Sequence, residues 1–267
     1  MTFPGMAVSK AGPSAPSELR AALSLGWLMA LHDTRMRYRG SILGPLWLTA
    51  NLAATGLGVS FMYAALFHIP YQTYLAYLMT GLVVWAFVFQ VLSEASTAFI
   101  AAAGVIRNVR LPLLSHVFRV LFRQAIIMAH NLLVLILILV LTGQLHPWGI
   151  VPAFLNLFLV AIALLPAIAI LAMLGVRFRD VPQIVTNLLQ FIMFLTPIFW
   201  RAEDASGRGA FIYSNPFYHL IALFRQPLLG GPLAWQSYAV VGGIAVVGLV
   251  IAALAFRWGR DRIVFWV

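Results

Sequence analysis

Three arginines lie within five residues in the stretch "RMRYRGSILGPLW" at 35–47. They are Arg35, Arg37 and Arg39, and a long apolar run follows them. A guanidinium group can hold a phosphate through two parallel hydrogen bonds, so this cluster has the chemistry of a phosphate site. Arginines beside an apolar run also anchor a chain at the membrane surface, which explains the cluster without a ligand. Both interpretations stay open.

Other reactive groups are scarce. The chain has no cysteine and a single lysine, Lys10, which no G-x-x-x-x-G-K-[ST] phosphate loop surrounds. No His-x-x-x-His pair or carboxylate cluster has the spacing of metal ligands. We therefore expect no catalytic residue, no metal site and no ATPase site in this chain.

The composition indicates a membrane protein. Of 267 residues, 63% are hydrophobic and only 9% are charged, whereas soluble domains carry roughly 25% charged residues. The net charge of +10 could point to nucleic acid. The basic residues lie between long apolar runs, however, which favours anionic lipid headgroups and no nucleic acid partner.

Six apolar segments are long enough to cross a bilayer, which takes roughly 20 helical residues. We expect an all-α integral membrane fold with spans at about 41–67, 73–101, 114–142, 147–175, 182–200 and 235–258. Fourteen of the 17 Lys and Arg residues lie before the first span, in the even-numbered connections or after the sixth span. The positive-inside rule then places both termini in the cytoplasm.

Residues 18–33 differ from a span. Apolar Leu19, Ala22, Leu23, Trp27, Ala30 and Leu31 recur there at helical spacing among polar residues. This pattern predicts an amphipathic helix in the plane of the lipid headgroups. We therefore divide the chain into a cytoplasmic segment, 1–34, that contains this helix, and one transmembrane domain, 35–267.

The fifth span carries a polar stripe. Gln183, Asn187, Gln190 and Phe194 recur every three or four residues, which puts them on one helix face. Polar groups inside lipid line a pathway or join helices by hydrogen bonds. Three amides at this spacing favour a pathway.

The second span has two polar or aromatic faces. Glu94 needs a cation, and Arg119 or Arg123 of the third span lies at similar depth, so we expect an intramembrane ion pair. That pair could fix helix register or act in transport. Tyr77 and Trp85 lie nearly opposite Glu94 and could stack on a sugar ring or belong to an interfacial aromatic belt. Unless the helix bends, only one of the two faces can line a pathway.

Five stretches, in this order, resemble the membrane subunit of bacterial type-2 ABC exporters, specifically the group that carries O-antigen, capsule or teichoic-acid polymers. They are "RYRGSILGPLW" at 37–47, "GVIRNVRLP" at 104–112, "FRDVPQIVTNLLQFIMFLTPIFW" at 178–200, "SNPFYHLIALFRQPLLGG" at 214–231 and the closing "DRIVFWV". The resemblance covers nearly the whole chain.

This resemblance implies a homodimer of six-span subunits in the bacterial inner membrane, with two copies of a separate ATPase subunit that bind ATP and Mg. This chain itself would hold no cofactor. Residues 18–33 and the 104–112 loop would contact the ATPase, the latter through Val105, Ile106, Arg107, Asn108 and Arg110. That loop could instead be an ordinary positive-inside connection. Residues 201–234 would form short re-entrant helices.

The expected function is therefore that of a permease subunit that moves a lipid-linked polysaccharide out of the cytoplasm. One or more of Arg35, Arg37 and Arg39 would bind the pyrophosphate headgroup. The polymer would pass near spans one, two and five. The alternatives are a drug or small-lipid exporter permease of the same superfamily and an integral membrane glycosyl- or acyltransferase.

Overall fold

Long apolar helices make up most of the chain. The computed structural model describes residues 15–40, 44, 46–109, 111–202, 209–232 and 235–266, and no strand occurs among them. A helix satisfies its backbone polar groups internally, as a chain in lipid requires. The helices are α1 (Ala15–Arg37), α2 (Leu46–Phe67), α3 (Tyr71–Ala95), α4 (Ala98–Ala101), α5 (Ala103–Asn108), α6 (Leu114–Leu141), η1 (Pro147–Gly149), α7 (Ile150–Arg177), α8 (Val181–Leu195), α9 (Gly209–Tyr213), α10 (Pro216–Leu228) and α11 (Trp235–Trp266).

Five helical segments among the described residues are long and apolar enough to cross a membrane. They are Leu46–Phe67, Tyr71–Ala95, Leu114–Leu141, Pro147–Arg177 and Trp235–Gly259. Each overlaps one of the six predicted spans. The all-helical, multi-pass membrane architecture predicted from the sequence is confirmed.

The predicted span at 182–200 is not one uninterrupted crossing helix. Its helix, α8, has 15 residues, or roughly 22 Å at 1.5 Å per residue, and a hydrocarbon core is about 30 Å thick. The helix ends before Thr196, whose ψ of 137° is extended, because Pro197 disfavours helical backbone in the residue before it. The structure therefore does not confirm the count of six full-length spans.

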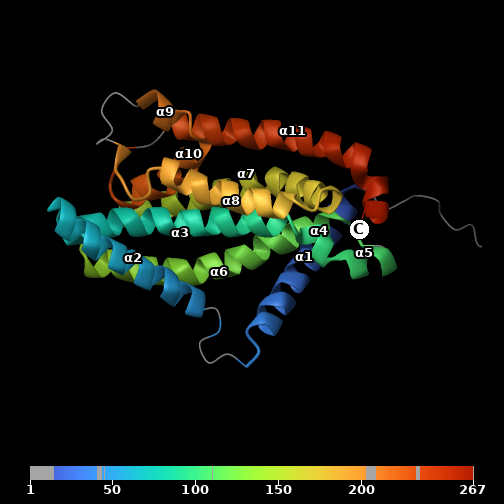
Figure 1. Cartoon of the computed structure of the whole chain (residues 1–267), viewed down its shortest axis with the longest axis horizontal. Helices are drawn as coiled ribbons and strands as arrows, with labels where there is room; N and C mark the ends of the chain where they lie inside the picture. The colour runs from blue at the N-terminus through green and yellow to red at the C-terminus, as the bar shows by residue number, and fades with distance from the viewer. Residues whose placement is uncertain are drawn as a thin grey trace, which may run out of the picture.

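Helix α3 is the centre of the bundle. It packs against α2, α6, α7, α8 and α10, and Figure 1 shows it running between α6 and α8. In an apolar stretch of 18 residues, α3 has 78% of its residues buried, whereas α2 has 11% of its residues buried in a stretch of the same length. Polar side chains on α3 are therefore held by neighbouring helices, whereas α2 exposes most of its surface.

The two ends of the bundle differ. Helices α4 and α5 lie at one end, together with the C-terminal part of α11, and we call this the α5 end (Figure 1). Helices α9 and α10, with the turn between α2 and α3, lie toward the opposite end, which we call the α9 end. The short helices predicted between the last two spans are α9 and α10.

Small residues bring α1 against α6. Ala22, Gly26 and Ala30, four residues apart, are all buried, and a Cβ added at Gly26 would lie 2.7 Å from Phe118 Cβ. Such spacing lets two helix backbones approach closely. The predicted helix at 18–33 is present, but it extends past residue 34 to Arg37, and large residues such as Trp27 stay exposed. Small residues rather than large ones make its buried face.

Candidate functional site

Two carboxylates and two arginines meet where α1, α3 and α6 come together. Arg119 Nε of α6 lies 2.5 Å from Asp33 Oδ2 of α1. Arg123 forms an ion pair with Glu94 of α3 and donates a 3.4 Å hydrogen bond to Asp33. The Gln124 amide donates a hydrogen bond to the same Glu94 carboxylate. The two carboxylates balance the two arginines, so the network joins the three helices without leaving a net charge between them.

The sequence left open which arginine pairs with Glu94. In the structure Glu94 forms an ion pair with Arg123, and Arg119 forms one with Asp33. The sequence did not identify Asp33 as a partner of Arg119. A signal for Asp33 was present, because it follows Ala22, Gly26 and Ala30 on one helix face at spacings of four, four and three residues. The helix was predicted to lie in the plane of the lipid headgroups, so its carboxylate was not matched to a partner.

A second polar group of side chains lines a cavity of about 240 Å³ between α2, α3 and α6, which we call the α2 cavity. Its polar lining consists of Arg37, Asn51, Thr55, Gln90, Gln124 and Asn131. Arg37 is the only charged residue among the lining residues that the structure describes. Each water in liquid occupies roughly 30 Å³, so the cavity has room for several waters or for a small polar group.

Several of these groups are available to bind a ligand. Within the described residues, the side chains of Arg37, Asn51 and Gln90 have no hydrogen bond or ion pair, whereas Asn131 Oδ1 accepts a 2.8 Å hydrogen bond from Thr49. The cavity thus presents one solvent-exposed cation and several amides between apolar helices. Such a lining suits a polar group that carries negative charge and hydrogen-bonding oxygens.

Only one of the three clustered arginines reaches this cavity. All three side chains are exposed, but only Arg37, the last residue of α1, also lines the cavity. The structure therefore separates the predicted headgroup residues into one that lines the cavity and two that do not.

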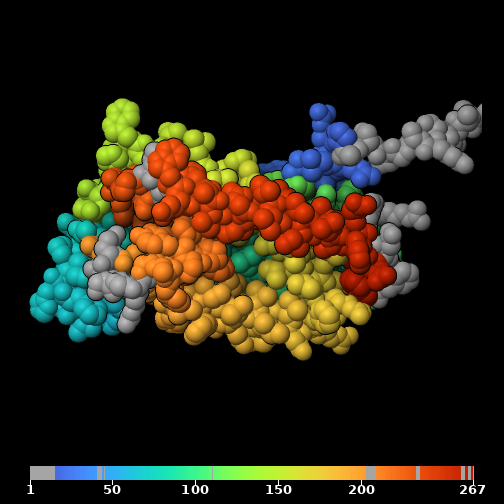
Figure 2. Space-filling view, turned by 90° about the horizontal axis from the view of Figure 1, so that it is seen from above, coloured from blue at the N-terminus to red at the C-terminus, as the bar shows by residue number. Residues whose placement is uncertain are grey.

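The polar stripe of α8 is exposed in this subunit. Gln183, Asn187, Gln190 and Phe194 all lie on the surface, and the Gln183 amide donates a 2.9 Å hydrogen bond to Asn187. The helix packs mainly against α3 and α7, and its residues form the lower edge of the molecule in Figure 2. The subunit leaves this mixed polar and apolar face available to another chain or to a pathway.

Tyr77 and Trp85 lie inside the subunit instead. The Tyr77 hydroxyl donates hydrogen bonds to the carbonyl oxygens of Pro197, at 3.2 Å, and Trp200, at 2.9 Å. Trp85 is only 4% exposed and packs edge-on against Phe217 of α10. The structure does not bring these two side chains to the exposed α8 stripe, and the surroundings of Trp85 shield it from a passing molecule.

The predicted ATPase-contacting residues form α5, which makes its main contact with α4 and stands at one end of the bundle (Figure 1). Val105, Arg107 and Asn108 are exposed, and Ile106 is half-buried. The Asn108 amide donates a 2.7 Å hydrogen bond to the Gly104 carbonyl, which closes the last turn. Arg110 lies outside the described residues.

No family model matches this chain. It is 24% identical over 251 residues to an O-antigen export system permease protein RfbA of Klebsiella pneumoniae, covering 87% of this chain and 95% of the relative. A second Klebsiella pneumoniae protein of that name is 21% identical over 253 residues, which cover 90% of this chain and 95% of the relative. A Myxococcus xanthus protein of that name is 27% identical over 252 residues, covering 89% and 94%. These matches confirm, over nearly the whole chain, the similarity to permease subunits of type-2 ABC exporters that the sequence motifs indicated.

Proposed function

We propose that this chain is the membrane subunit of an ATP-driven exporter that moves a lipid-linked polysaccharide from the cytoplasm across the bacterial inner membrane. The observation that carries the proposal is the similarity to O-antigen export permeases over about nine tenths of the chain. The absence of a Walker-type phosphate loop from the sequence agrees with ATP hydrolysis by a separate subunit.

In this proposal the α5 end faces the cytoplasm, as do both termini, because most of the cations lie there. Two such subunits form a homodimer, and each binds one ATPase subunit, with its ATP and Mg, through the exposed face of α5. Val105, Arg107 and Asn108 give this face both apolar and polar contacts. A short helix at the end of the bundle, with Ile106 packed against the core, can transmit motion from the ATPase to the spans.

The α2 cavity receives the phosphate-bearing headgroup of the substrate. Arg37 supplies the positive charge, and Asn51, Gln90 and Asn131 supply hydrogen bonds. Arg35 and Arg39 add positive charge at the surface, where they attract anionic groups. The polymer then passes between the two subunits along the α8 stripe, where Asn187 and Gln190 offer hydrogen bonds to sugar hydroxyls.

The test of this function is a bacterial strain that lacks the protein. We expect its surface polysaccharide to disappear and lipid-linked glycan to accumulate inside the cell, with both effects reversed by the wild-type gene. Unchanged surface polysaccharide would contradict the proposal. Altered drug sensitivity alone would favour a drug exporter, and glycosyl or acyl transfer by the purified chain would favour an enzyme.

Replacing Arg37 by lysine should lower export about fivefold to tenfold, because lysine keeps the charge but loses the two parallel hydrogen bonds to phosphate. The measurement is the rate at which surface polysaccharide appears after induction, normalised to the amount of protein in the membrane. Arg35→Lys is the matched control and should export normally. Normal export by Arg37→Lys would mean that the arginines only anchor the chain.

Replacing Asn187 and Gln190 together by leucine should reduce surface polysaccharide severalfold, because sugar hydroxyls would lose hydrogen-bond partners along the pathway. The double variant should still insert in the membrane at the wild-type level, since both side chains are exposed. Gln72→Leu, an exposed glutamine at the start of α3, is the control. If the double variant exported polysaccharide at the wild-type level, the α8 stripe would not line the pathway.

A further inference from the structure

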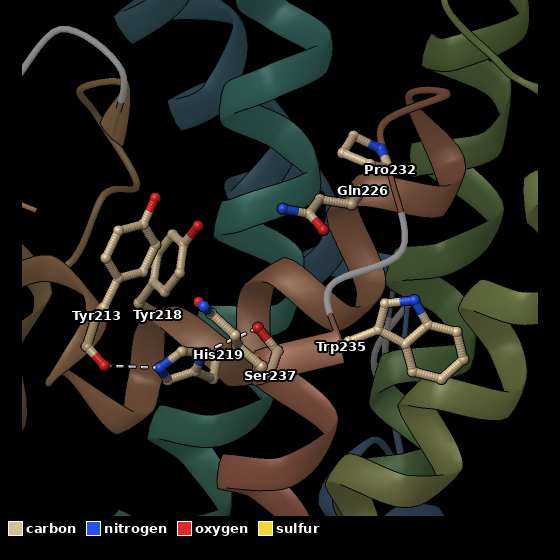
Figure 3. Close-up of a pocket in the computed structure, with 8 residues that line it drawn as sticks. Tyr213, Tyr218, His219, Gln226, Pro232, Trp235 and Ser237 are labelled. Atoms are coloured by element: carbon tan, nitrogen blue, oxygen red, sulfur yellow. Dashed lines mark hydrogen bonds between the residues drawn. The ribbon is translucent and has the colours of Figure 1, made fainter.

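A second cavity, of about 320 Å³, lies at the α9 end, where α9, α10 and α11 meet. We call it the α10 cavity. It is lined by Tyr213, Tyr218, His219, Gln226, Pro232, Trp235, Gln236 and Ser237. Figure 3 shows the two tyrosines on one side, Trp235 on the other, and the Gln226 amide directed toward the space between them. Its volume lies near the lower end of the range of roughly 300–1,000 Å³ for small-molecule sites.

The walls of this cavity are held in place by His219, which is 2% exposed. Its Nε2 lies 2.8 Å from the Tyr213 carbonyl oxygen, and its Nδ1 lies 2.8 Å from Ser237 Oγ. A carbonyl oxygen can only accept, so Nε2 carries the proton and the Ser237 hydroxyl donates to Nδ1. One side chain of α10 thereby ties α9 to α11. The helices that carry the aromatic rings are thereby held in place relative to one another, which reduces the entropy cost of binding.

The chemistry of the lining combines aromatic faces with amides. Trp235 is 72% exposed, and the Tyr213 and Tyr218 rings meet edge-on with centroids 5.6 Å apart. Gln226 Oε1 is buried and has no hydrogen-bond partner in the described part of the chain. A buried acceptor without a donor is costly, and a turn of the Gln226 amide toward the cavity would let a ligand hydroxyl satisfy it.

The lack of charge in the lining distinguishes between charged and neutral candidate ligands. None of the described residues that line the α10 cavity is an acid, a lysine or an arginine. A phosphate or a zwitterionic lipid headgroup would lose water there without gaining a counter-charge for its phosphate. A neutral sugar ring fits better, because its C–H face packs on an aromatic ring and its hydroxyls both donate and accept hydrogen bonds.

We propose that the α10 cavity binds one neutral sugar ring of a glycan, with Trp235 as the stacking surface and Gln226 as a hydroxyl acceptor. This inference rests on the proposed function in taking that glycan to be the exported polymer. The site lies at the end of the bundle opposite α5, so it would hold the polymer where it leaves the membrane. A sugar ring bound there would oppose backward sliding of the polymer between successive rounds of ATP hydrolysis.

The experiment measures binding of methyl glycosides of glucose, galactose, mannose and rhamnose to the purified protein in phosphatidylcholine nanodiscs, by saturation-transfer NMR. At least one glycoside should bind, with the strongest transfer to the ring protons of one face. Trp235→Ala should weaken that binding about fivefold to tenfold. Gln226→Leu should weaken it severalfold. Trp148→Ala, which removes a tryptophan that is 86% exposed and does not line the cavity, should leave it unchanged.

Three outcomes would overturn the assignment. The first is that the wild-type protein binds no glycoside. The second is that Trp235→Ala and Trp148→Ala weaken glycoside binding equally. The third is that the protein binds phosphocholine instead of glycosides and that this binding depends on Trp235. The test needs neither the ATPase nor a lipid carrier. Export without glycoside binding would therefore defeat the sugar site alone, whereas Trp235-dependent binding in a chain that exports no glycan would support the site and defeat the proposed function.

Discussion

Gly175→Ala should sharply reduce the amount of folded protein, although it adds a single methyl group. A Cβ at Gly175 of α7 would lie 1.7 Å from the Ser96 carbonyl oxygen, just after α3. The atom that it meets belongs to the backbone and cannot rotate away, so α7 and the α3–α4 connection would have to separate. Overpacking of this kind costs about 3 kcal/mol. The measurement is the monodisperse fraction after detergent extraction, with the melting temperature of what remains.

Gly243→Ala is the matched control, because α11 leaves open space around the position of its added Cβ. It should keep the wild-type yield and melting temperature or raise them slightly, since alanine favours a helix over glycine by about 1 kcal/mol. If both variants behaved alike, the close approach of α7 to Ser96 would not exist in the folded protein.

The membrane-spanning helices were predictable because they depend on local composition. Long apolar runs between basic or proline-bearing connections located α2, α3, α6, α7 and α11 to within several residues. The resemblance likewise indicated short helices between the last two spans, and α9 and α10 lie there. Helix formation in lipid needs only that each backbone group be satisfied within its own segment, which the local sequence determines.

Contacts between distant segments were not predictable in the same way. The sequence did not indicate that α8 would stop before Pro197 with the following residues packed on α3, where Tyr74 donates a 2.6 Å hydrogen bond to the Phe199 carbonyl. It also predicted that the helix at 18–33 lies in the plane of the lipid headgroups, and did not indicate that Ala22, Gly26 and Ala30 would pack on α6. Hydropathy ranks large apolar residues highest, but helices approach most closely through small ones.

The candidate site shows the same division. The sequence identified the arginine cluster at 35–39 and the need of Glu94 for a cation, because both features lie within one segment. It could not single out Arg37 as the residue that reaches a cavity, since that depends on how α1 meets α2, α3 and α6. Helical phase did separate the Tyr77 face of α3 from the Glu94 face, and the two have different neighbours in the structure.

Arg123→Leu should be among the most destabilising single substitutions in the chain. It would leave the Glu94 carboxylate inside the bundle with only the Gln124 amide as a partner. Breaking a buried pair by removing one ion costs roughly 3–5 kcal/mol. We expect a much lower extraction yield and melting temperature, whereas Arg257→Leu, at an exposed arginine of α11, should change neither.

The double variant Arg123→Leu with Glu94→Leu should recover most of the lost stability, because two apolar side chains replace a pair whose desolvation already cost much of its attraction. If it is as unstable as Arg123→Leu alone, Glu94 is not the group that needs Arg123. The same double variant decides between the two roles that the sequence left open for this pair. A pair that only fixes the register of α3 against α6 predicts a stable double variant that still exports polysaccharide, whereas a direct role in transport predicts a stable double variant that does not.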